Sequence, residues 1–223
     1  MSPLELARKI DQTLLRPDAD LKMMDKFCKD AIEYHFASVC ILPYYTKYAA
    51  ELLHDTDVKV CTVVGFPLGA TFRSAKQYEA DAAILGGAGE IDMVMNIAAF
   101  KSGRREEALH DMENITRLAG RSEVITKVII ETALLTKEEK IDVCKIVTDS
   151  GADFIKTSTG FAKGGATIED IMLLKENTGE NVKVKASGGI KTAKFALELI
   201  KAGADRIGAS AGIEIIKEAE QRQ

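Results

Sequence analysis

Short apolar runs alternate with longer amphipathic stretches along the whole chain. The apolar runs have the length and the valine, isoleucine and methionine content of buried β-strands, and eight of them can be distinguished. They lie at residues 9–15, 37–43, 58–65, 90–97, 123–130, 153–159, 182–187 and 205–210. The stretches between them show a helical period, as in "SAKQYEADAAILGG" and "KEEKIDVCKIVTDSG". The pattern therefore predicts eight strands, each followed by a helix.

Glycines mark the points at which several of these helices end. Gly86, Gly87, Gly151 and Gly203 each follow a helical stretch, as helix C-cap glycines often do. The segments "GGAGEID", "SGADFIK" and "AGADRIG" share one form, in which a glycine and an alanine precede an acidic residue and a strand. This recurrence indicates one supersecondary unit that is used repeatedly.

Eight strand–helix units in 223 residues fit a single (β/α)8 TIM barrel. The alternative is a doubly wound open sheet, but no G-x-G-x-x-G motif opens the first helix. The number of strands favours the barrel. We therefore expect one α/β catalytic domain over residues 1–223.

Charged side chains fall on the predicted inner faces of four neighbouring strands, because side chains alternate along a strand. They are Glu90, Asp92, Lys127, Glu131, Lys156, Lys183 and Lys185. A structural ion network that fills the barrel is one interpretation. The other begins from Lys156 in "DFIKTSTGF", because burial and a second ammonium group both favour the neutral amine. A neutral amine is the nucleophile that forms a Schiff base. The lysines near the ends of adjacent strands, Lys156 and Lys185, favour this second interpretation.

Three glycine-containing turns follow late strands: "STGFAKGGAT", "ASGGIKT" and "IGASAGIEI". The loops after the seventh and eighth strands of such barrels commonly bind a phosphate through backbone N–H groups. Gly188, Gly189, Gly208 and Ser210 are the candidates for this role. The alternative is that these glycines only serve tight turns.

Composition excludes several classes of function. The net charge is −4, with 30 basic and 34 acidic residues interspersed, so no basic stripe indicates a nucleic-acid partner. The apolar runs are too short to span a membrane, and the first residues lack the apolar core of a signal peptide. The four cysteines are scattered, as expected of free thiols in the cytoplasm. The three histidines show no metal-ligand spacing, so neither a metal nor another cofactor is expected.

The chain resembles the deoxyribose-phosphate aldolases, which are class I aldolases with a (β/α)8 barrel, over nearly its full length. The segments that carry the resemblance are "IDQTLL", "SVCILP", "VVGFPLGA", "EIDMVMNI", "KVIIET", "FIKTSTGF", "VKASGGI" and "RIGASAG". The lysine strand with its run of hydroxyl residues and the "KASGG" turn are specific when they occur together. The resemblance therefore supports the reactive-lysine interpretation.

The resemblance implies a role for each matching residue. Lys156 would form the Schiff base, Lys185 would favour its neutral form, and Asp92 would relay protons through an ordered water. The residues implied in the pocket are Asp11, Thr13 and Cys40, with Lys127 as a supporting charge, and those implied in phosphate binding are Gly160, Gly188, Gly189, Gly208 and Ser210. The chain departs from the pattern at Gln12, where many members have histidine, and at Ala209 and Ala211, which lack hydroxyl groups.

The implied reaction is the reversible cleavage of 2-deoxy-D-ribose 5-phosphate into D-glyceraldehyde 3-phosphate and acetaldehyde. The resemblance also implies a homodimer. A second enzymatic interpretation is a Schiff-base aldolase with a keto-acid donor, but this donor would need an arginine in the pocket, and the inward positions of the predicted strands show none. A third interpretation is a barrel without catalytic activity that only binds a sugar phosphate or serves as a subunit of an assembly.

Overall fold

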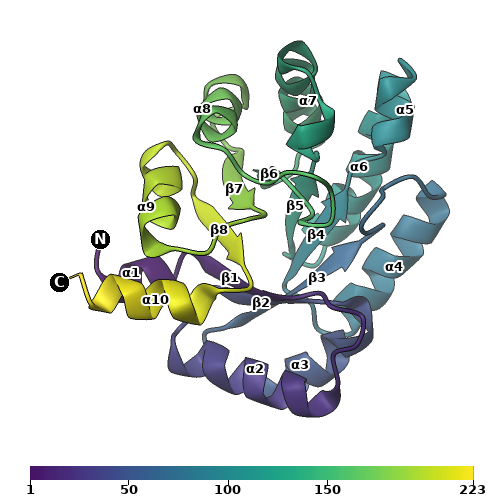
Figure 1. Ribbon diagram of the computed structural model, residues 1–223. Helices are drawn as coiled ribbons and strands as arrows, with labels where there is room; N and C mark the ends of the chain where they lie inside the picture. Colours follow the sequence, from purple (N-terminus) through teal and green to yellow (C-terminus); the bar gives the residue numbers. More distant parts are fainter. Residues whose placement is uncertain (223) are drawn as a thin grey trace.

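The computed structural model describes residues 1–222, which form a closed barrel of eight parallel strands surrounded by helices (Figure 1). Residue 223, the last of the expected domain, lies outside the described residues. The strands are β1 (Ile10–Leu14), β2 (Ser38–Ile41), β3 (Lys59–Val64), β4 (Glu90–Val94), β5 (Ile125–Ile129), β6 (Phe154–Lys156), β7 (Lys183–Ser187) and β8 (Arg206–Ala209). All eight predicted strands are present, and each is shorter than expected.

The barrel closes because β1 pairs with β2 on one side and with β8 on the other. Ile10 lies opposite Ile207, and Asp11 lies opposite Gly208, in a parallel register. The described sheet therefore has no free edge, and the open doubly wound alternative is wrong. The predicted (β/α)8 TIM barrel is confirmed.

Helices follow the strands and form the outer layer (Figure 1). The α-helices are α1 (Pro3–Ala7), α2 (Leu21–Glu33), α3 (Thr46–Leu52), α4 (Arg73–Leu85), α5 (Ile97–Lys101), α6 (Arg105–Gly120), α7 (Lys137–Asp149), α8 (Ile168–Asn177), α9 (Ala193–Lys201) and α10 (Gly212–Glu220), and short 3₁₀ helices span η1 (Pro43–Tyr45) and η2 (Thr132–Leu134). Side chains at several N-termini accept hydrogen bonds from the first turn, as Thr136 does from the Glu139 amide in α7. These caps define where the helices begin.

Successive side chains of each strand point alternately into the barrel and out toward the helices. Ile91 and Met93 of β4 belong to the hydrophobic core, whereas Glu90 and Asp92 take the opposite face. All four side chains are buried, as expected for a parallel sheet that is covered by helices outside and filled with side chains inside. The apolar core therefore lies around the barrel, and charged groups fill its interior.

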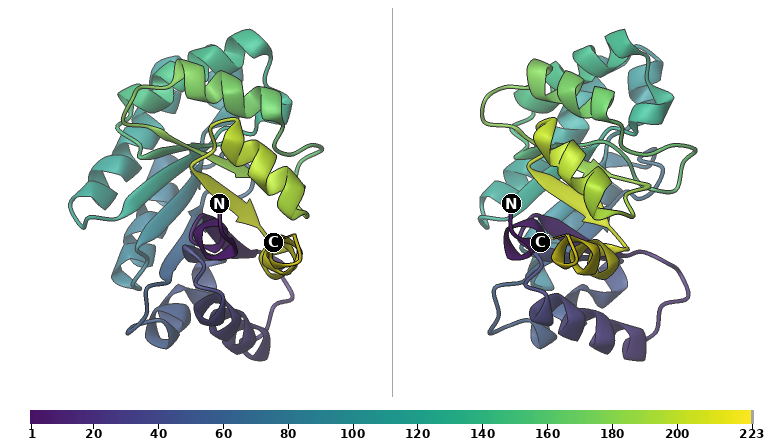
Figure 2. Two further views of the ribbon diagram at one scale, coloured as in Figure 1. Left: turned by 90° about the vertical axis from the view of Figure 1, so that its left-hand side faces the viewer. Right: turned by 60° about the vertical axis from the view of Figure 1, so that its left-hand side comes forward.

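The described N-terminal helix packs beside the last helix, α10, and Figure 2 shows the two marked ends of the chain close together. Because α1 precedes β1 and α10 returns after β8, both ends lie toward the start of the strands. None of the described helices is long and apolar enough to cross a bilayer. The loops that surround the candidate site lie on the opposite face of the barrel, where the strands end.

Candidate active site

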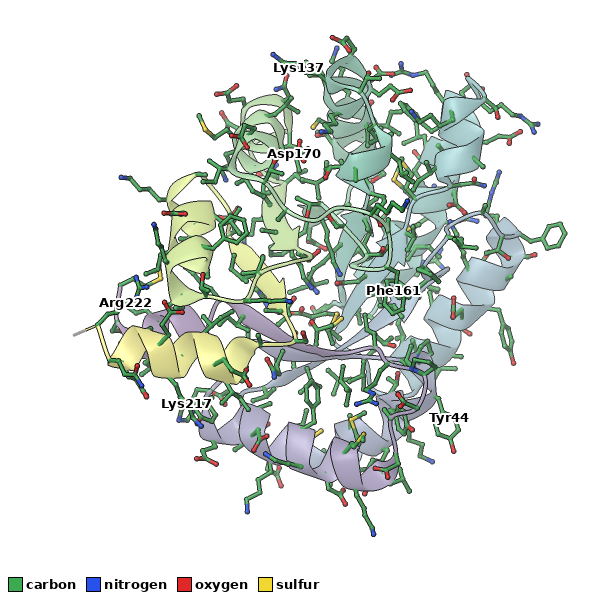
Figure 3. The ribbon with its side chains drawn as sticks, in the orientation of Figure 1. Tyr44, Lys137, Phe161, Asp170, Lys217 and Arg222 are labelled. Carbon is green, nitrogen blue, oxygen red and sulfur yellow. The ribbon has the colours of Figure 1, made fainter. Side chains whose placement is uncertain are left out.

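A cavity of about 350 Å³ opens where the strands end. Lys156 lies at its base, and the loops after β1, β6, β7 and β8 form its walls. Phe161, in the loop after β6, contributes one wall, and Figure 3 shows it near the middle of the molecule, whereas Lys137 and Lys217 lie on outer helices. The cavity therefore occupies the face on which TIM barrels carry their active sites.

Beneath the cavity, three lysines converge on the carboxylate of Asp92. Lys156 Nζ lies 2.6 Å from Asp92 Oδ2, and Lys185 Nζ lies 2.7 Å from the same oxygen. Lys127 Nζ lies 2.8 Å from Oδ1. Lys127, Lys185 and Asp92 are fully buried, whereas Lys156 is 3% exposed and borders the cavity. Of the three ammonium groups, that of Lys156 is the one that a ligand in the cavity can reach.

The other two lysines have additional anionic partners. Lys185 Nζ lies 2.5 Å from Asp11 Oδ2, and Lys127 Nζ lies 2.5 Å from Glu90 Oε2. No second carboxylate lies within ion-pair distance of Lys156 among the described residues. Lys156 is thus the lysine that is held by the fewest counter-charges.

The surroundings of these groups determine their ionisation. Burial opposes the charged form of Asp92, but the three lysines outweigh burial and hold the pKa of this carboxyl well below its usual range. Burial likewise opposes the charged form of Lys185, yet Asp11 and Asp92 raise its pKa above the usual value. Burial also opposes the charged form of Lys127, but Asp92, Cys61, Glu90 and Asp11 together raise its pKa well above the usual value. Asp92, Lys127 and Lys185 are therefore all charged near neutral pH.

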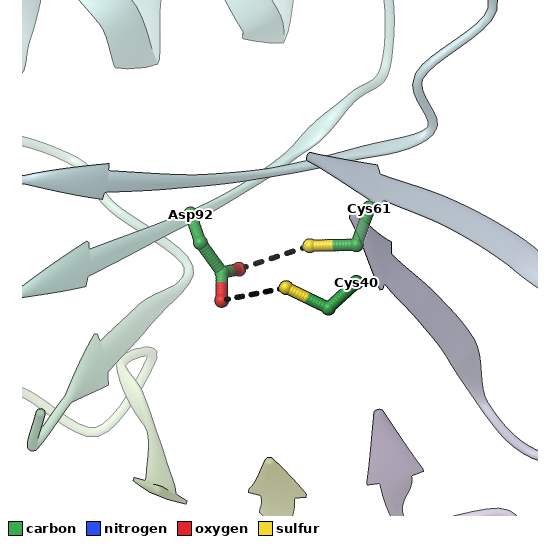
Figure 4. A group of neighbouring side chains, drawn as sticks. All are labelled: Cys40, Cys61 and Asp92. Carbon is green, nitrogen blue, oxygen red and sulfur yellow. Dashed lines mark hydrogen bonds between the residues drawn. The ribbon is translucent and has the colours of Figure 1, made fainter. Parts of the chain in front are cut away.

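Two thiols also face the Asp92 carboxylate (Figure 4). Cys61 Sγ lies 3.1 Å from Oδ1 and Cys40 Sγ lies 3.9 Å from Oδ2, so three possible metal-ligand atoms lie within 4.8 Å of one another. The same carboxylate oxygens accept hydrogen bonds from the three lysine ammonium groups at 2.6–2.8 Å. A divalent cation would be repelled by these charges, so the group does not fit a metal site.

The predicted phosphate-binding residues lie together along the cavity wall. The wall includes Gly160, Gly188, Gly189, Gly208 and Ser210, as well as Thr13. Gly188 has φ +89°, and a Cβ at this position would lie 2.9 Å from the Cα of Gly165. A side chain there would therefore be strained and would collide with the neighbouring loop. By contrast, Asp11, Cys40 and Lys127 lie in the buried layer beneath the cavity and do not line it.

The hydroxyl run after Lys156 fastens the loops around the cavity. Thr157 Oγ1 donates to the Ser187 carbonyl and accepts from the Ser187 amide, both at 3.1 Å. Thr159 binds Glu131 through its amide at 3.0 Å and through its hydroxyl at 2.5 Å. The residues after Lys156 thus leave the strand expected at 153–159 and connect the ends of β5, β6 and β7.

The comparisons with known proteins agree with this geometry. Residues 6–218 match the family model described as "DeoC/LacD family aldolase". The chain belongs to the DeoC/LacD aldolase family. It is 52% identical over 214 residues to the deoxyribose-phosphate aldolase of Staphylococcus carnosus, with 96% of each chain covered. It is 50% identical to that of Clostridium tetani, with 97% of this chain and all of the relative covered.

Solved structures of aldolases share the fold of this DeoC/LacD family member. The structure described as "QR15, an Aldolase" has a TM-score of 0.93 and 41% identity, and the match covers 98% of this chain and 97% of that one. The deoxyribose phosphate aldolase of Aeropyrum pernix, described as having a unique tetrameric structure, has a TM-score of 0.93 and 31% identity, with 100% and 94% covered. The resemblance that the sequence motifs predicted is confirmed.

Sequence reasoning missed one inward arginine in this aldolase. Arg206, at the start of β8, points into the barrel and donates to Asp11 Oδ1 at 2.6 Å and to Glu90 Oε1 at 3.4 Å. The expectation that the inward positions hold no arginine is wrong. Alternation from Gly208 and Ser210, which line the cavity, would have placed Arg206 on the inner face.

Arg206 does not line the cavity, because it lies at the start of β8, whereas Gly208 and Ala209 at the end of the strand do. Its guanidinium carbon lies 5.7 Å from the centre of the Phe154 ring, and Lys183 Nζ lies 5.6 Å from the same ring. These three side chains lie together where β6, β7 and β8 begin. Because Arg206 is already paired with two carboxylates, it is not available to bind the carboxylate of a substrate.

Proposed function

We propose that this chain catalyses the reversible cleavage of 2-deoxy-D-ribose 5-phosphate to D-glyceraldehyde 3-phosphate and acetaldehyde through a Schiff base on Lys156. The observation that carries the proposal is the position of the Lys156 amine, which lies between the buried charges and the cavity. The names of the relatives, about 50% identical over nearly the whole chain, support the same substrate.

The charges around Lys156 support its role as the nucleophile. Inside the barrel, four cationic side chains, those of three lysines and one arginine, face three carboxylates. Loss of one proton would leave three positive and three negative charges inside the barrel, and an excess of buried charge is costly. Lys156 has one carboxylate partner and borders the cavity, so its amine is the one that can meet the carbonyl group of a substrate. The neutral amine would then attack the carbonyl carbon of the sugar phosphate.

The subsequent steps need a proton carrier and an electron sink. Loss of water from the carbinolamine gives an iminium on Lys156, which withdraws electrons as the C–C bond breaks. The departing fragment is D-glyceraldehyde 3-phosphate, and an enamine of acetaldehyde remains. Asp92, whose Oδ2 lies 2.6 Å from Lys156 Nζ, would relay protons through a bound water. Protonation of the enamine and hydrolysis release acetaldehyde, and synthesis is the reverse sequence.

The phosphate end would bind the glycine-rich wall. The loops after β7 and β8, with the exposed Ser210, line the same cavity as Phe161, and their backbone N–H groups would bind the phosphate. Such groups suit an anion, because they offer hydrogen bonds without the cost of burying an additional charge. Lys185, fixed between Asp11 and Asp92, would keep a positive charge beside Lys156 and thereby favour the neutral amine.

The experiment that tests the proposal is trapping of the Schiff base. The protein is incubated with acetaldehyde and borohydride, and the modified lysine is mapped by peptide mass spectrometry. We expect a reduced adduct confined to Lys156, and turnover of 2-deoxyribose 5-phosphate in a coupled assay. A protein with Lys156→Met serves as the control and should give no adduct. Absence of an adduct, or one spread over surface lysines, would favour a barrel that only binds a sugar phosphate.

A further inference from the structure

Gln12 is a buried amide whose role the reaction does not explain. It lies in β1 between Asp11, which points into the barrel, and Thr13, which lines the cavity. Gln12 therefore faces outward, toward the layer between barrel and helices, and it is only 4% exposed. A buried amide is costly unless its donor and acceptor are both satisfied.

Both ends of the Gln12 amide bind the same loop. Nε2 donates to the Ser210 carbonyl at 3.3 Å, and Oε1 accepts from the Gly212 amide at 3.0 Å. A Cβ at Gly212 would lie 2.2 Å from Gln12 Oε1, so the side chain lies directly against the backbone. Gln12 thus holds the connection from β8 to α10 at two points, although 200 positions separate it from Gly212 in the chain.

The loop that Gln12 holds includes the exposed Ser210 of the cavity wall. Within the described residues, the Ser210 hydroxyl makes no hydrogen bond, and Ala211 offers no side-chain cap to α10. Among the described residues, Gln12 therefore supplies the side-chain hydrogen bonds that hold this loop, whereas the Ser210 hydroxyl, on the cavity wall, remains available to a ligand.

We propose that Gln12 is a positioning residue that sets the Ser210–Gly212 loop for the phosphate end of the substrate and so determines the preference for phosphorylated over unphosphorylated sugar. This inference rests on the proposed function. Gln12 lies on the outer face of β1 and does not touch the Lys156 cluster. Replacing it should therefore change binding of the phosphate end of the substrate and not the reaction at Lys156. Loss of the amide would leave the Ser210 carbonyl and the Gly212 amide without partners, and the loop would relax.

The test compares two substrates in matched variants. In Gln12→Leu, we expect kcat/KM for 2-deoxyribose 5-phosphate to fall about tenfold or more, mainly through KM, because two hydrogen bonds are lost. The kcat/KM for unphosphorylated 2-deoxyribose should stay within about twofold. Gln12→His keeps one donor and one acceptor and should restore most of the ratio between the substrates. If Gln12→Leu does not fold, Gln12→Met, which matches glutamine in length, takes its place.

A matched control removes a similar hydrogen bond at a distance from the loop. Thr62 is a fully buried residue of β3, and its hydroxyl donates to the Ile41 carbonyl at 3.0 Å. Thr62→Val should lower stability without changing the ratio between the two substrates. An unchanged ratio in the leucine and methionine variants would overturn the inference, and so would a histidine variant that is no better than the leucine variant.

Binding of inorganic phosphate separates this inference from the proposed function. Phosphate affinity is measured by ³¹P NMR in the wild-type protein and in the Gln12 variants, and it requires no turnover. We expect weaker binding in Gln12→Leu by a factor similar to the rise in KM. If the wild-type protein does not cleave 2-deoxyribose 5-phosphate, the proposed function fails. Equal phosphate affinity in wild type and variants would overturn the role of Gln12 whatever the reaction.

Discussion

Lys76 and Lys156 are both buried lysines that contact a carboxylate, but their surroundings differ. Lys76, in α4, donates to Asp111 Oδ2 at 2.5 Å and to the Val94 carbonyl at 2.7 Å, outside the barrel. This is a pair of one cation and one anion, and neither side chain borders the cavity. Lys156, by contrast, shares Asp92 with two other lysines and has one side open to the cavity.

The difference shows that burial alone does not make a lysine reactive. Burial lowers the pKa of Lys76, with Asp111 opposing the effect, and burial raises the pKa of Asp111. Even so, no ligand can reach the Lys76 amine, whose role is to fasten α4 to the end of β4 and to α6. The proposed reactivity of Lys156 rests on its access to the cavity and on its counter-ion, Asp92, which it shares with two other lysines.

The largest expected effect on activity is that of removing the nucleophile. Lys156→Ala should lower kcat by about 10⁴-fold or more, because no other amine at the base of the cavity can form the iminium. The protein should remain folded, since the change leaves Asp92 with two ammonium partners. Steady-state kinetics and circular dichroism measure the two quantities. Residual activity within a hundredfold of wild type would contradict the assignment of Lys156.

The next effect concerns the pH at which activity appears. Lys185→Leu removes a cation that favours the neutral amine, so the rise in kcat/KM should move to higher pH by about one to three units. The raised pKa of Lys185 keeps it charged across this range, so it is not itself the group that titrates. Lys185→Arg preserves the charge and should leave the profile near its original position. Identical profiles for the leucine variant and wild type would show that Lys185 has no electrostatic effect on the nucleophile.

The smallest effect on activity should come from the pair outside the barrel. Lys76→Met leaves the Asp111 carboxyl without its partner and should lower the free energy of unfolding by about 3–5 kcal/mol, as loss of one member of a buried pair does. The kcat of the folded enzyme should stay within about threefold. Denaturant unfolding and kinetics at a permissive temperature measure both.

The double variant Lys76→Met with Asp111→Leu sharpens the same comparison. Replacement of the whole pair by apolar residues should recover most of the stability, because no uncompensated charge remains. A loss of kcat well beyond about threefold in the folded double variant would mean that the outer pair contributes to the reaction as well as to the fold.

The sequence predicted most of the fold because strand and helix periods are local properties. Every strand contained an apolar run, and alternation within β4 to β7 placed Asp92, Lys127, Lys156 and Lys185 on the inner face. The proximity of Lys156 to Lys185 also followed from the order of the strands. β6 pairs with β7, and this pairing places the two lysines opposite each other.

Contacts between distant segments were not predictable in the same way. Glu131 turns away from the strand face expected for it, because its backbone is left-handed (φ 52°) and its side chain binds Thr159 of the next loop. The Gln12 amide forms hydrogen bonds with Ser210 and Gly212, about 200 residues later in the chain, and no local sequence pattern predicts these contacts. Arg206 differs from these two residues, because it lies two positions before Gly208 on the same face of β8, and alternation along that strand predicts its inward side chain.

The barrel interior beneath Lys156 is filled by buried charged side chains, among them Glu90 and Lys127. Lys156 borders the cavity on the side where the strands end. If the proposed Schiff base forms, both fragments of the substrate would therefore enter and leave through this one opening. The fragment bound to Lys156 would be the first to enter during synthesis and the last to leave during cleavage, because it is attached at the base of the cavity.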